Sequence, residues 1–238
     1  MIEKNNISFN HLKIHTQYSI CEGALKIENL RSYCKNNKIK AIGLSDTSNL
    51  CGALEFAENL SKAGTQPIIG TQINFKYKNM VGLMPLFAMS IDGYKRIIEL
   101  SSKSYLENDG LSLPHCDFSD LIEHNSGIGI FSGTINGLVG KLFNKGMYKD
   151  IIEIYSILKS NFDNRFYIEI QRHGDLNEKA FEKYNLQNSK DLNIPIIATH
   201  EVFYIEQDMF EAHDALICIG NKTYVNEKNR INFTNQHY

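Results

Sequence analysis

The fold is decided by the stretch Ile194-Pro-Ile-Ile-Ala-Thr-His-Glu-Val-Phe-Tyr204. Residues 195–199 are mostly apolar on both faces of an extended chain, which is typical of a strand in a parallel sheet that helices cover or that closes into a barrel. The polar pair His200 and Glu201 follows directly. In such barrels the functional side chains lie on loops after the C-terminal ends of the strands. The stretch therefore predicts both a buried strand and the place to look for a site.

The same alternation of short apolar runs with longer helical segments repeats along the chain, as in successive βα units. The expected strands are residues 12–15, 41–45, 67–75, 83–89, 127–131, 165–171 and 195–199. Apolar stripes at helical spacing follow them: Ile27, Leu30 and Cys34; Leu54, Phe56, Ala57 and Leu60; Tyr94, Ile97, Ile98 and Ser101; Ile151, Ile152, Ile154, Tyr155 and Leu158. An open doubly wound sheet would also fit, but seven strands favour a (β/α)7 barrel with mostly parallel strands.

Composition points to an ordinary globular protein of one domain. The 238 residues are 42% hydrophobic and 22% charged, with a formal charge of −2, so the basic surface expected of a protein that binds nucleic acid by itself is absent. No apolar run approaches the length of a membrane helix, and the first residues do not resemble a secretion signal. We therefore expect a cytoplasmic location, no membrane association, and free thiols at Cys21, Cys34, Cys51, Cys116 and Cys218.

An incomplete metal-binding pattern occurs near the N-terminus. His11, Lys13 and His15 alternate, so they share one face of a strand. A protonated lysine has no lone pair to offer a cation. The segment is therefore either a strand that happens to carry two histidines or a dismantled metal site. Other polar residues at predicted strand ends are Asp46, Thr47, Gln72, Thr134, His173, His200 and Glu201.

The sequence segments at these strand ends, taken in order, resemble the polymerase and histidinol phosphatase (PHP) domain at the N-terminus of the bacterial DNA polymerase III alpha subunit. They are Asn10-His-Leu-Lys-Ile-His-Thr-Gln-Tyr-Ser-Ile-Cys-Glu-Gly23, Ala41-Ile-Gly-Leu-Ser-Asp-Thr-Ser-Asn-Leu-Cys-Gly52, Pro67-Ile-Ile-Gly-Thr-Gln72, Asp92-Gly-Tyr-Lys-Arg-Ile-Ile-Glu-Leu100, Phe131-Ser-Gly-Thr134, Phe166-Tyr-Ile-Glu-Ile-Gln-Arg-His-Gly174, the opening stretch, and His213-Asp-Ala-Leu-Ile-Cys-Ile-Gly220. The resemblance covers all 238 residues. It implies a distorted (β/α)7 barrel, a single PHP domain over residues 1–238, and a much longer subunit whose palm, fingers and thumb lie outside this chain.

Metal-binding members of that family carry His, Asp and Glu ligands at the barrel mouth. By the resemblance, the corresponding positions here are Lys13, His15, Glu22, Thr47, Gln72, Leu83, Thr134, Glu201 and Phe203. Only His15, Glu22 and Glu201 remain competent ligands, which is too few for a multinuclear site. We expect no metal and no catalytic residue, with Asp46, His173 and His200 also lining the mouth. We further expect the Lys13 ammonium to replace a metal and pair with Glu22 or Glu201.

The remaining histidines have structural interpretations. His115, His124 and His237 are expected in surface loops, His213 in a helix, and His11 packed behind the mouth.

Three functions compete. The resemblance favours a non-catalytic module of the replicase that supports the remainder of the alpha subunit and docks the proofreading exonuclease (epsilon) subunit, with DNA reached only through the full polymerase. The alternative is a Zn- or Mn-dependent phosphoesterase, either a phosphatase or a 3′–5′ exonuclease, using His15, Glu22, Glu201 and His173 as a reduced site. A histidinol phosphatase that acts alone fits the strand-end phrases less well.

Overall fold

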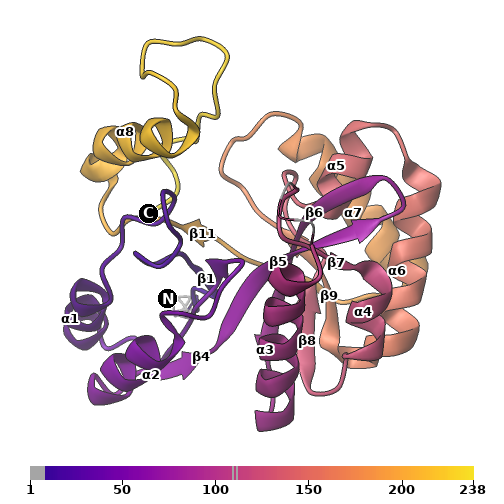
Figure 1. Cartoon of the computed structure of the whole chain (residues 1–238), viewed down its shortest axis with the longest axis horizontal. Coiled ribbons are helices and arrows are strands. Elements are labelled where there is room, and N and C mark those ends of the chain that lie inside the picture. Colours follow the sequence, from indigo (N-terminus) through magenta and orange to yellow (C-terminus); the bar gives the residue numbers. More distant parts are fainter. Residues whose placement is uncertain (1–8, 109, 111) are drawn as a thin grey trace, which may run out of the picture.

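A computed structural model describes residues 9–108, 110 and 112–238 of the chain (Figure 1). Its strands are β1 (Lys13–Ile14), β2 (Ala41–Gly43), β3 (Asp46–Thr47), β4 (Gln66–Ile68), β5 (Gly70–Tyr77), β6 (Met80–Ala88), β7 (Cys116–Asp117), β8 (Ile128–Phe131), β9 (Phe166–Ile170), β10 (Ile196–Ala198) and β11 (Glu201–Val202). Its α-helices are α1 (Ile27–Asn37), α2 (Ala53–Lys62), α3 (Ile91–Leu106), α4 (Phe118–Glu123), α5 (Leu138–Asn144), α6 (Tyr148–Phe162), α7 (Glu178–Leu192) and α8 (Phe210–Asn221). Two 3₁₀ turns, Asp163–Arg165 and Gln207–Met209, precede β9 and α8.

The strands in the described part of the chain are divided among three sheets. The largest has the order β10-β9-β8-β6-β5-β3, with β7 also paired to β5, while β1 pairs with β11 and β2 with β4. Among the strands of the described residues, the β5–β6 and β6–β8 pairings are antiparallel and the other pairings are parallel. The prediction of an α/β fold with mostly parallel strands is therefore confirmed.

Each expected strand is present, but one of them is interrupted. Residues 67–75 were expected to form a single strand, whereas β4 ends at Ile68 and β5 begins at Gly70. The two halves have different partners, because β4 pairs with β2 while β5 pairs with β3 and β6. A side chain at Gly70 would lie 2.5 Å from the carbonyl oxygen of Leu86, so the crossover requires glycine. This break moves the chain from one sheet to another.

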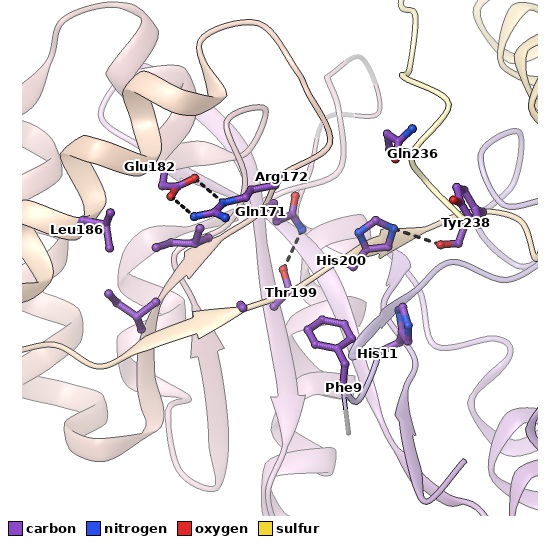
Figure 2. A pocket seen from close by; sticks show the side chains of 13 residues that line it. Phe9, His11, Gln171, Arg172, Glu182, Leu186, Thr199, His200, Gln236 and Tyr238 are labelled. Atoms are coloured by element: carbon purple, nitrogen blue, oxygen red, sulfur yellow. Dashed lines mark hydrogen bonds and ion pairs between the residues drawn. The ribbon is translucent and has the colours of Figure 1, made fainter. Parts of the chain in front are cut away.

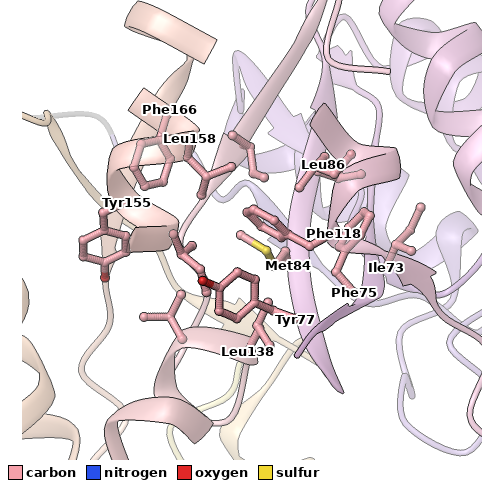
Figure 3. Close-up of a cluster of buried hydrophobic side chains, with 14 of the residues drawn as sticks. Ile73, Phe75, Tyr77, Met84, Leu86, Phe118, Leu138, Tyr155, Leu158 and Phe166 are labelled. Atoms are coloured by element: carbon pink, nitrogen blue, oxygen red, sulfur yellow. The ribbon is translucent and has the colours of Figure 1, made fainter. Parts of the chain in front are cut away.

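Two hydrophobic clusters stabilise the described part of the chain. The larger one lies between the main sheet and helices α3 to α7, and Figure 3 shows Phe75, Met84 and Leu86 of the sheet facing Tyr155 and Leu158 of α6. The smaller one joins α1 and α2 to β1 and β2 around Ile14, Leu44 and Phe56. The predicted helical stripes supply much of both clusters, except that Leu54 is 73% exposed and Ile98 is 40% exposed. In α2 the buried side is formed by Ala53, Phe56 and Leu60 instead.

Among the described helices, none combines the length and the apolar composition that crossing a bilayer requires.

Candidate functional site

The predicted mouth positions come together. Apart from Lys13, every one of them lines one cavity of about 510 Å³: His15, Glu22, Thr47, Gln72, Leu83, Thr134, Glu201 and Phe203. They arrive from the ends of β1, β3 and β11, from within β5 and β6, and from the loops after β1 and β8. Leu83 and Phe203 contribute apolar walls, and the Phe203 ring stacks on the imidazole of His15 with centroids 4.4 Å apart. We refer to this cavity as the mouth.

Lys13 lies beneath the mouth and has no solvent exposure. Its Nζ is 3.2 Å from Oε1 of Glu169 and 3.2 Å from Oε1 of Glu201. Burial disfavours the charged ammonium, but the two carboxylates outweigh burial and raise the pKa of Lys13. The predicted pairing with Glu201 is therefore confirmed. The predicted pairing with Glu22 is wrong, because the Glu22 carboxylate instead accepts a hydrogen bond from Thr47 Oγ1 at 2.6 Å.

Glu201 is the centre of the polar network. Its Oε1 lies 2.9 Å from His15 Nε2 and accepts a bond of 2.5 Å from the Gln72 side-chain amide. Burial opposes ionisation of this carboxyl group, but Lys13, His15 and Gln72 hold its pKa well below the usual range. The carboxylate is thus kept ionised by the Lys13 ammonium and the Gln72 side-chain amide. The nitrogen atoms that contact it are hydrogen-bond donors and cannot coordinate a cation.

Glu169 was not singled out from the sequence. It lies in β9, is 2% exposed, and shares Lys13 with Glu201. The Gln171 side-chain amide donates a hydrogen bond to Glu169 Oε1 at 3.0 Å, and the Thr199 hydroxyl donates to the same oxygen. The Gln171 amide also donates to the Thr199 hydroxyl, and Figure 2 shows this hydrogen bond. Its position as the one charged residue in the run Phe166-Tyr-Ile-Glu-Ile was the available signal.

Asp175 lines the mouth, and the sequence did not reveal it. Burial, followed by the nearby carboxylates of Glu178 and Glu201, raises the pKa of Asp175 to about 6.

Asp46 does not line the mouth, contrary to the prediction. The side chain is fully buried and fixes the turn after β1, where it accepts bonds from the backbone of Thr16 at 2.6 Å and from the hydroxyls of Thr16 and Ser19 at 2.8 and 2.9 Å. Asp46 is therefore a structural residue one layer behind the mouth.

The histidines singled out from the sequence lie in different places: His237 in the mouth, His173 behind it and His200 in another groove. His237 was expected at the surface and is only 2% exposed, because its ring stacks in parallel on that of His173 at 4.0 Å. His237 lines the mouth, whereas His173 lies behind it and accepts a bond from the Glu201 backbone at 3.2 Å. His200 lines a different, open groove of about 680 Å³ together with His11 (Figure 2), so its assignment to the mouth is wrong.

Comparison with known proteins decides the family. Residues 11–173 match the family model described as the PHP domain. The chain belongs to the PHP domain family. This PHP domain is 32% identical over 247 residues to the DNA polymerase III subunit alpha of Caulobacter vibrioides. The aligned region covers 100% of this chain and 22% of that protein. It is 37% identical over 213 residues to the subunit of the same name from Rickettsia felis, covering 89% of this chain and 18% of that protein.

The PHP domain thus spans about a fifth of the length of the curated relatives it matches. Among solved structures, it is similar to a protein from Bifidobacterium adolescentis whose description is a putative metal-dependent phosphoesterase, with a TM-score of 0.54, 9% identity, 81% of this chain covered and 86% of that one. At this identity the likeness shows the fold alone, and it confirms the PHP-type α/β fold.

The side chains of this PHP domain do not fit the divalent metals that the family fold implies. Among residues 9–108, 110 and 112–238, no three His, Cys, Asp or Glu side chains are grouped as metal ligands. His15 and Glu201 bind each other and Gln72, Glu22 binds Thr47, and the Lys13 ammonium already occupies the space between Glu169 and Glu201. A dication placed there would face a buried cation at close range, which is strongly unfavourable.

Proposed function

We propose that these residues form the PHP domain of a DNA polymerase III alpha subunit, a DNA replication enzyme, and that this domain is a structural, non-catalytic module. Two kinds of observation support the proposal. The sequence matches are to subunits of that name over essentially the whole chain. The mouth has leucine, phenylalanine and threonine at Leu83, Phe203 and Thr47, where the resemblance expects imidazole ligands.

The observation that carries the proposal is the burial of Lys13 between Glu169 and Glu201. Two buried carboxylates repel each other unless a cation compensates them. In a metal-binding barrel the metal supplies that positive charge, whereas here the ammonium supplies it as part of the chain. The ammonium then compensates the negative charge of Glu169 and Glu201 without a metal, as expected for a structural module.

The partners follow from the resemblance. They are the remainder of the alpha subunit, covalently attached, and the proofreading exonuclease (epsilon) subunit, bound at a surface of this domain. DNA is contacted through the full polymerase, since the net charge of this chain is −2 and a nucleic-acid surface would be basic. The location is the cytoplasm, where replication takes place.

Metal analysis of the full-length subunit, purified without chelators, is the primary test. We expect zinc and manganese well below one ion per chain, and an unchanged melting temperature after addition of EDTA. Stoichiometric metal together with metal-dependent phosphatase or 3′–5′ exonuclease activity, abolished by Glu201→Gln, would establish the phosphoesterase alternative instead.

Calorimetric titration with the purified exonuclease subunit tests the docking function separately. Saturable binding to the full-length alpha subunit is expected. A complete absence of heat and of a complex on gel filtration would reject docking while leaving the structural function in place.

A further inference from the structure

Positive charge is concentrated on α1 and in the turn after it. Residues 26–40 contain five basic side chains and one acidic side chain, a net charge of +4, whereas the whole chain carries −2. Four of these cations are exposed, and we call them the α1 basic face: Arg31, Lys35, Lys38 and Lys40. Figure 1 shows α1 at the outer edge of the molecule, on the opposite side from α7. The negative charge of the chain as a whole therefore conceals a positive surface.

Three of these side chains lie in one row along the helix. Arg31, Lys35 and Lys38 are spaced by four and then three residues, which places side chains of a helix above one another on one side. A different side of α1 is buried in the smaller hydrophobic cluster. With a rise of about 1.5 Å per residue, the row extends over about 10 Å. A row of cations of this length can face several successive phosphates of a nucleic-acid strand.

Acidic neighbours do not neutralise the α1 basic face. In the part of the chain that the structure describes, none of its four cations takes part in an ion pair, whereas Lys62, Lys78 and Lys103 each have a carboxylate partner. Arg31 donates only to the side-chain oxygen of Asn59 in α2, at 3.5 Å. The positive charge of this face is therefore available to an anion from outside the chain.

Lys38 occupies a backbone position that does not favour lysine. It ends α1 with φ 54° and ψ 41°, in the left-handed region, where glycine or asparagine is usual because a Cβ atom is crowded there. The dipole of α1 favours a cation in the last turn of the helix, and Lys35 already provides one. Lysine at position 38 is therefore better explained by an interaction that its side chain makes with a partner.

We propose that the α1 basic face binds the phosphate backbone of DNA that the full-length subunit holds. The inference rests on the proposed function, under which a polymerase active site outside these 238 residues binds a primer–template duplex. Its basis is charge complementarity, because unpaired lysine and arginine side chains neutralise phosphates and release the counterions around them. Contacts of this kind position the duplex and do not depend on its base sequence.

The contact belongs to the full-length subunit and not to the separate domain. Four cations on a chain with a net charge of −2 give the domain little attraction for DNA by itself. In the full-length subunit the duplex is already bound elsewhere on the same molecule. Its contact with the α1 basic face is then intramolecular and gains from a high effective concentration.

The salt dependence of DNA binding by the full-length subunit tests the proposal. Fluorescence anisotropy with a primer–template duplex measures the slope of log K against the logarithm of the KCl concentration, and each phosphate contact contributes about 0.9 to it. Lys35→Gln combined with Lys38→Gln should make this slope less steep by about 1.8. Lys183→Gln combined with Lys190→Gln removes the same charge from exposed positions of α7 and should leave the slope unchanged. An unchanged slope in the α1 variant, or an equal change in both variants, overturns the proposal.

A pair of glycine substitutions separates the loss of charge from damage to the helix end. Lys222 ends α8 with the same φ of 54° and ψ of 41° as Lys38, so glycine suits both positions. Lys38→Gly should reduce the slope by about 0.9, with a melting temperature equal to or above that of the unchanged subunit. Lys222→Gly should affect melting in the same way and leave the slope alone. A smaller slope in Lys38→Gly that comes with a lower melting temperature assigns Lys38 to the fold and overturns the proposal.

Footprinting by lysine acylation and mass spectrometry distinguishes DNA from an acidic protein as the partner. The primer–template duplex should protect Lys35 and Lys38 of the full-length subunit and leave Lys183 reactive. Protection by a polyglutamate peptide but not by the duplex would assign the face to an acidic protein and reject the proposal. A subunit with neither primer extension nor DNA binding would remove the proposed function together with this inference. Unchanged slopes in an active polymerase reject this inference alone.

Discussion

The ammonium nitrogen of Lys13 lies 3.2 Å from Oε1 of Glu169, and neither side chain has any solvent exposure. A second carboxylate, that of Glu201, lies at the same distance from the ammonium. Because the three groups come from β1, β9 and β11, the ion pair joins the small β1–β11 sheet to the main sheet. A buried pair of this kind contributes little net stability relative to apolar residues, but removal of one partner is costly.

Lys13→Ala should therefore destabilise the protein strongly. It leaves two buried carboxylates without their cation, and we expect a loss of about 3–5 kcal/mol in the free energy of unfolding. Urea denaturation at pH 7.5 measures it. Lys76→Ala, at an exposed lysine of β5, is the control and should leave the midpoint nearly unchanged.

A compensated variant separates lost charge from lost packing. If unpaired carboxylates cause the damage, Lys13→Met combined with Glu169→Gln and Glu201→Gln should be more stable than Lys13→Met alone, because no buried charge remains. A compensated variant that is no more stable than the single substitution would show that the lysine contributes mainly by filling space.

Stability should fall as the pH is lowered from 7 to 5, because the stacked imidazoles of His173 and His237 are neutral in the folded protein. Burial, helped by neighbouring histidines, lowers the pKa of His173 to about 3, and burial lowers the pKa of His237 to about 4. In the unfolded chain both imidazoles titrate near the ordinary histidine pKa of 6.5. Below that pH the unfolded state binds more protons, so stability decreases by up to about 1.4 kcal/mol per pH unit for each group.

Urea midpoints at pH 7.5, 6 and 5 measure this slope, and His237→Phe is the test variant. It removes one of the two imidazoles. The slope of its free energy of unfolding against pH should therefore be smaller by the contribution of about one proton, whatever the stability of the variant at pH 7.5. Work above pH 5 keeps Glu201 out of the comparison, since its pKa lies well below 4.5. His11, His200 and His213, whose pKa values burial also lowers, act in the same direction. Asp175, whose pKa burial raises to about 6, acts in the opposite direction, but it is common to the wild type and His237→Phe and cancels in their comparison. An unchanged slope in His237→Phe would contradict the conclusion that His237 is neutral in the folded protein.

Gly93→Ala should be poorly tolerated, because the first turn of α3 lies directly on the loop before β8. A Cβ at Gly93 would be 1.8 Å from the carbonyl oxygen of Gly127, so backbone must move. We expect a loss of at least about 3 kcal/mol in the free energy of unfolding, at the upper end for an overpacked site. Gly64→Ala is the matched control, since nothing lies within 4 Å of its Cβ position and only its φ of +79° is unfavourable. It should cost about 1 kcal/mol.

The mouth could be predicted from sequence because parallel strands end at a common edge of the sheet. Thr47 ends β3 and Glu201 follows the end of β10 in the same sheet, so the order of the strand-end segments was enough to place them near one another. Glu169 could not be identified in the same way. It lies inside β9, and its orientation toward Lys13 depends on the pairing of Glu169 with Ile197, a register that no local pattern encodes.

The same limit explains the errors over His237 and over the strand expected at residues 67–75. His237 belongs to an irregular segment, and its burial comes from stacking on His173, which is 64 positions earlier in the chain. The interruption between β4 and β5 reflects a change of partner strand rather than a change of composition. Local propensity predicts that a segment is extended, but long-range pairing decides where it ends.

Asp46→Ala should loosen the turn after β1 without removing any mouth side chain. Asp46 is fully buried and accepts hydrogen bonds from the Thr16 backbone, the Thr16 hydroxyl and the Ser19 hydroxyl. Without it, three buried donors lose their acceptor, and we expect a loss of about 3 kcal/mol or more in the free energy of unfolding. Hydrogen exchange should accelerate at residues 16–23 before it does in the main sheet. Asp46→Asn, which keeps one carbonyl acceptor, should lose less than Asp46→Ala. Because Ser19 Oγ also accepts a bond from the Thr47 backbone at 3.0 Å, wild-type exchange at residues 16–23 in Asp46→Ala would show that Ser19 and Thr47 hold the turn by themselves.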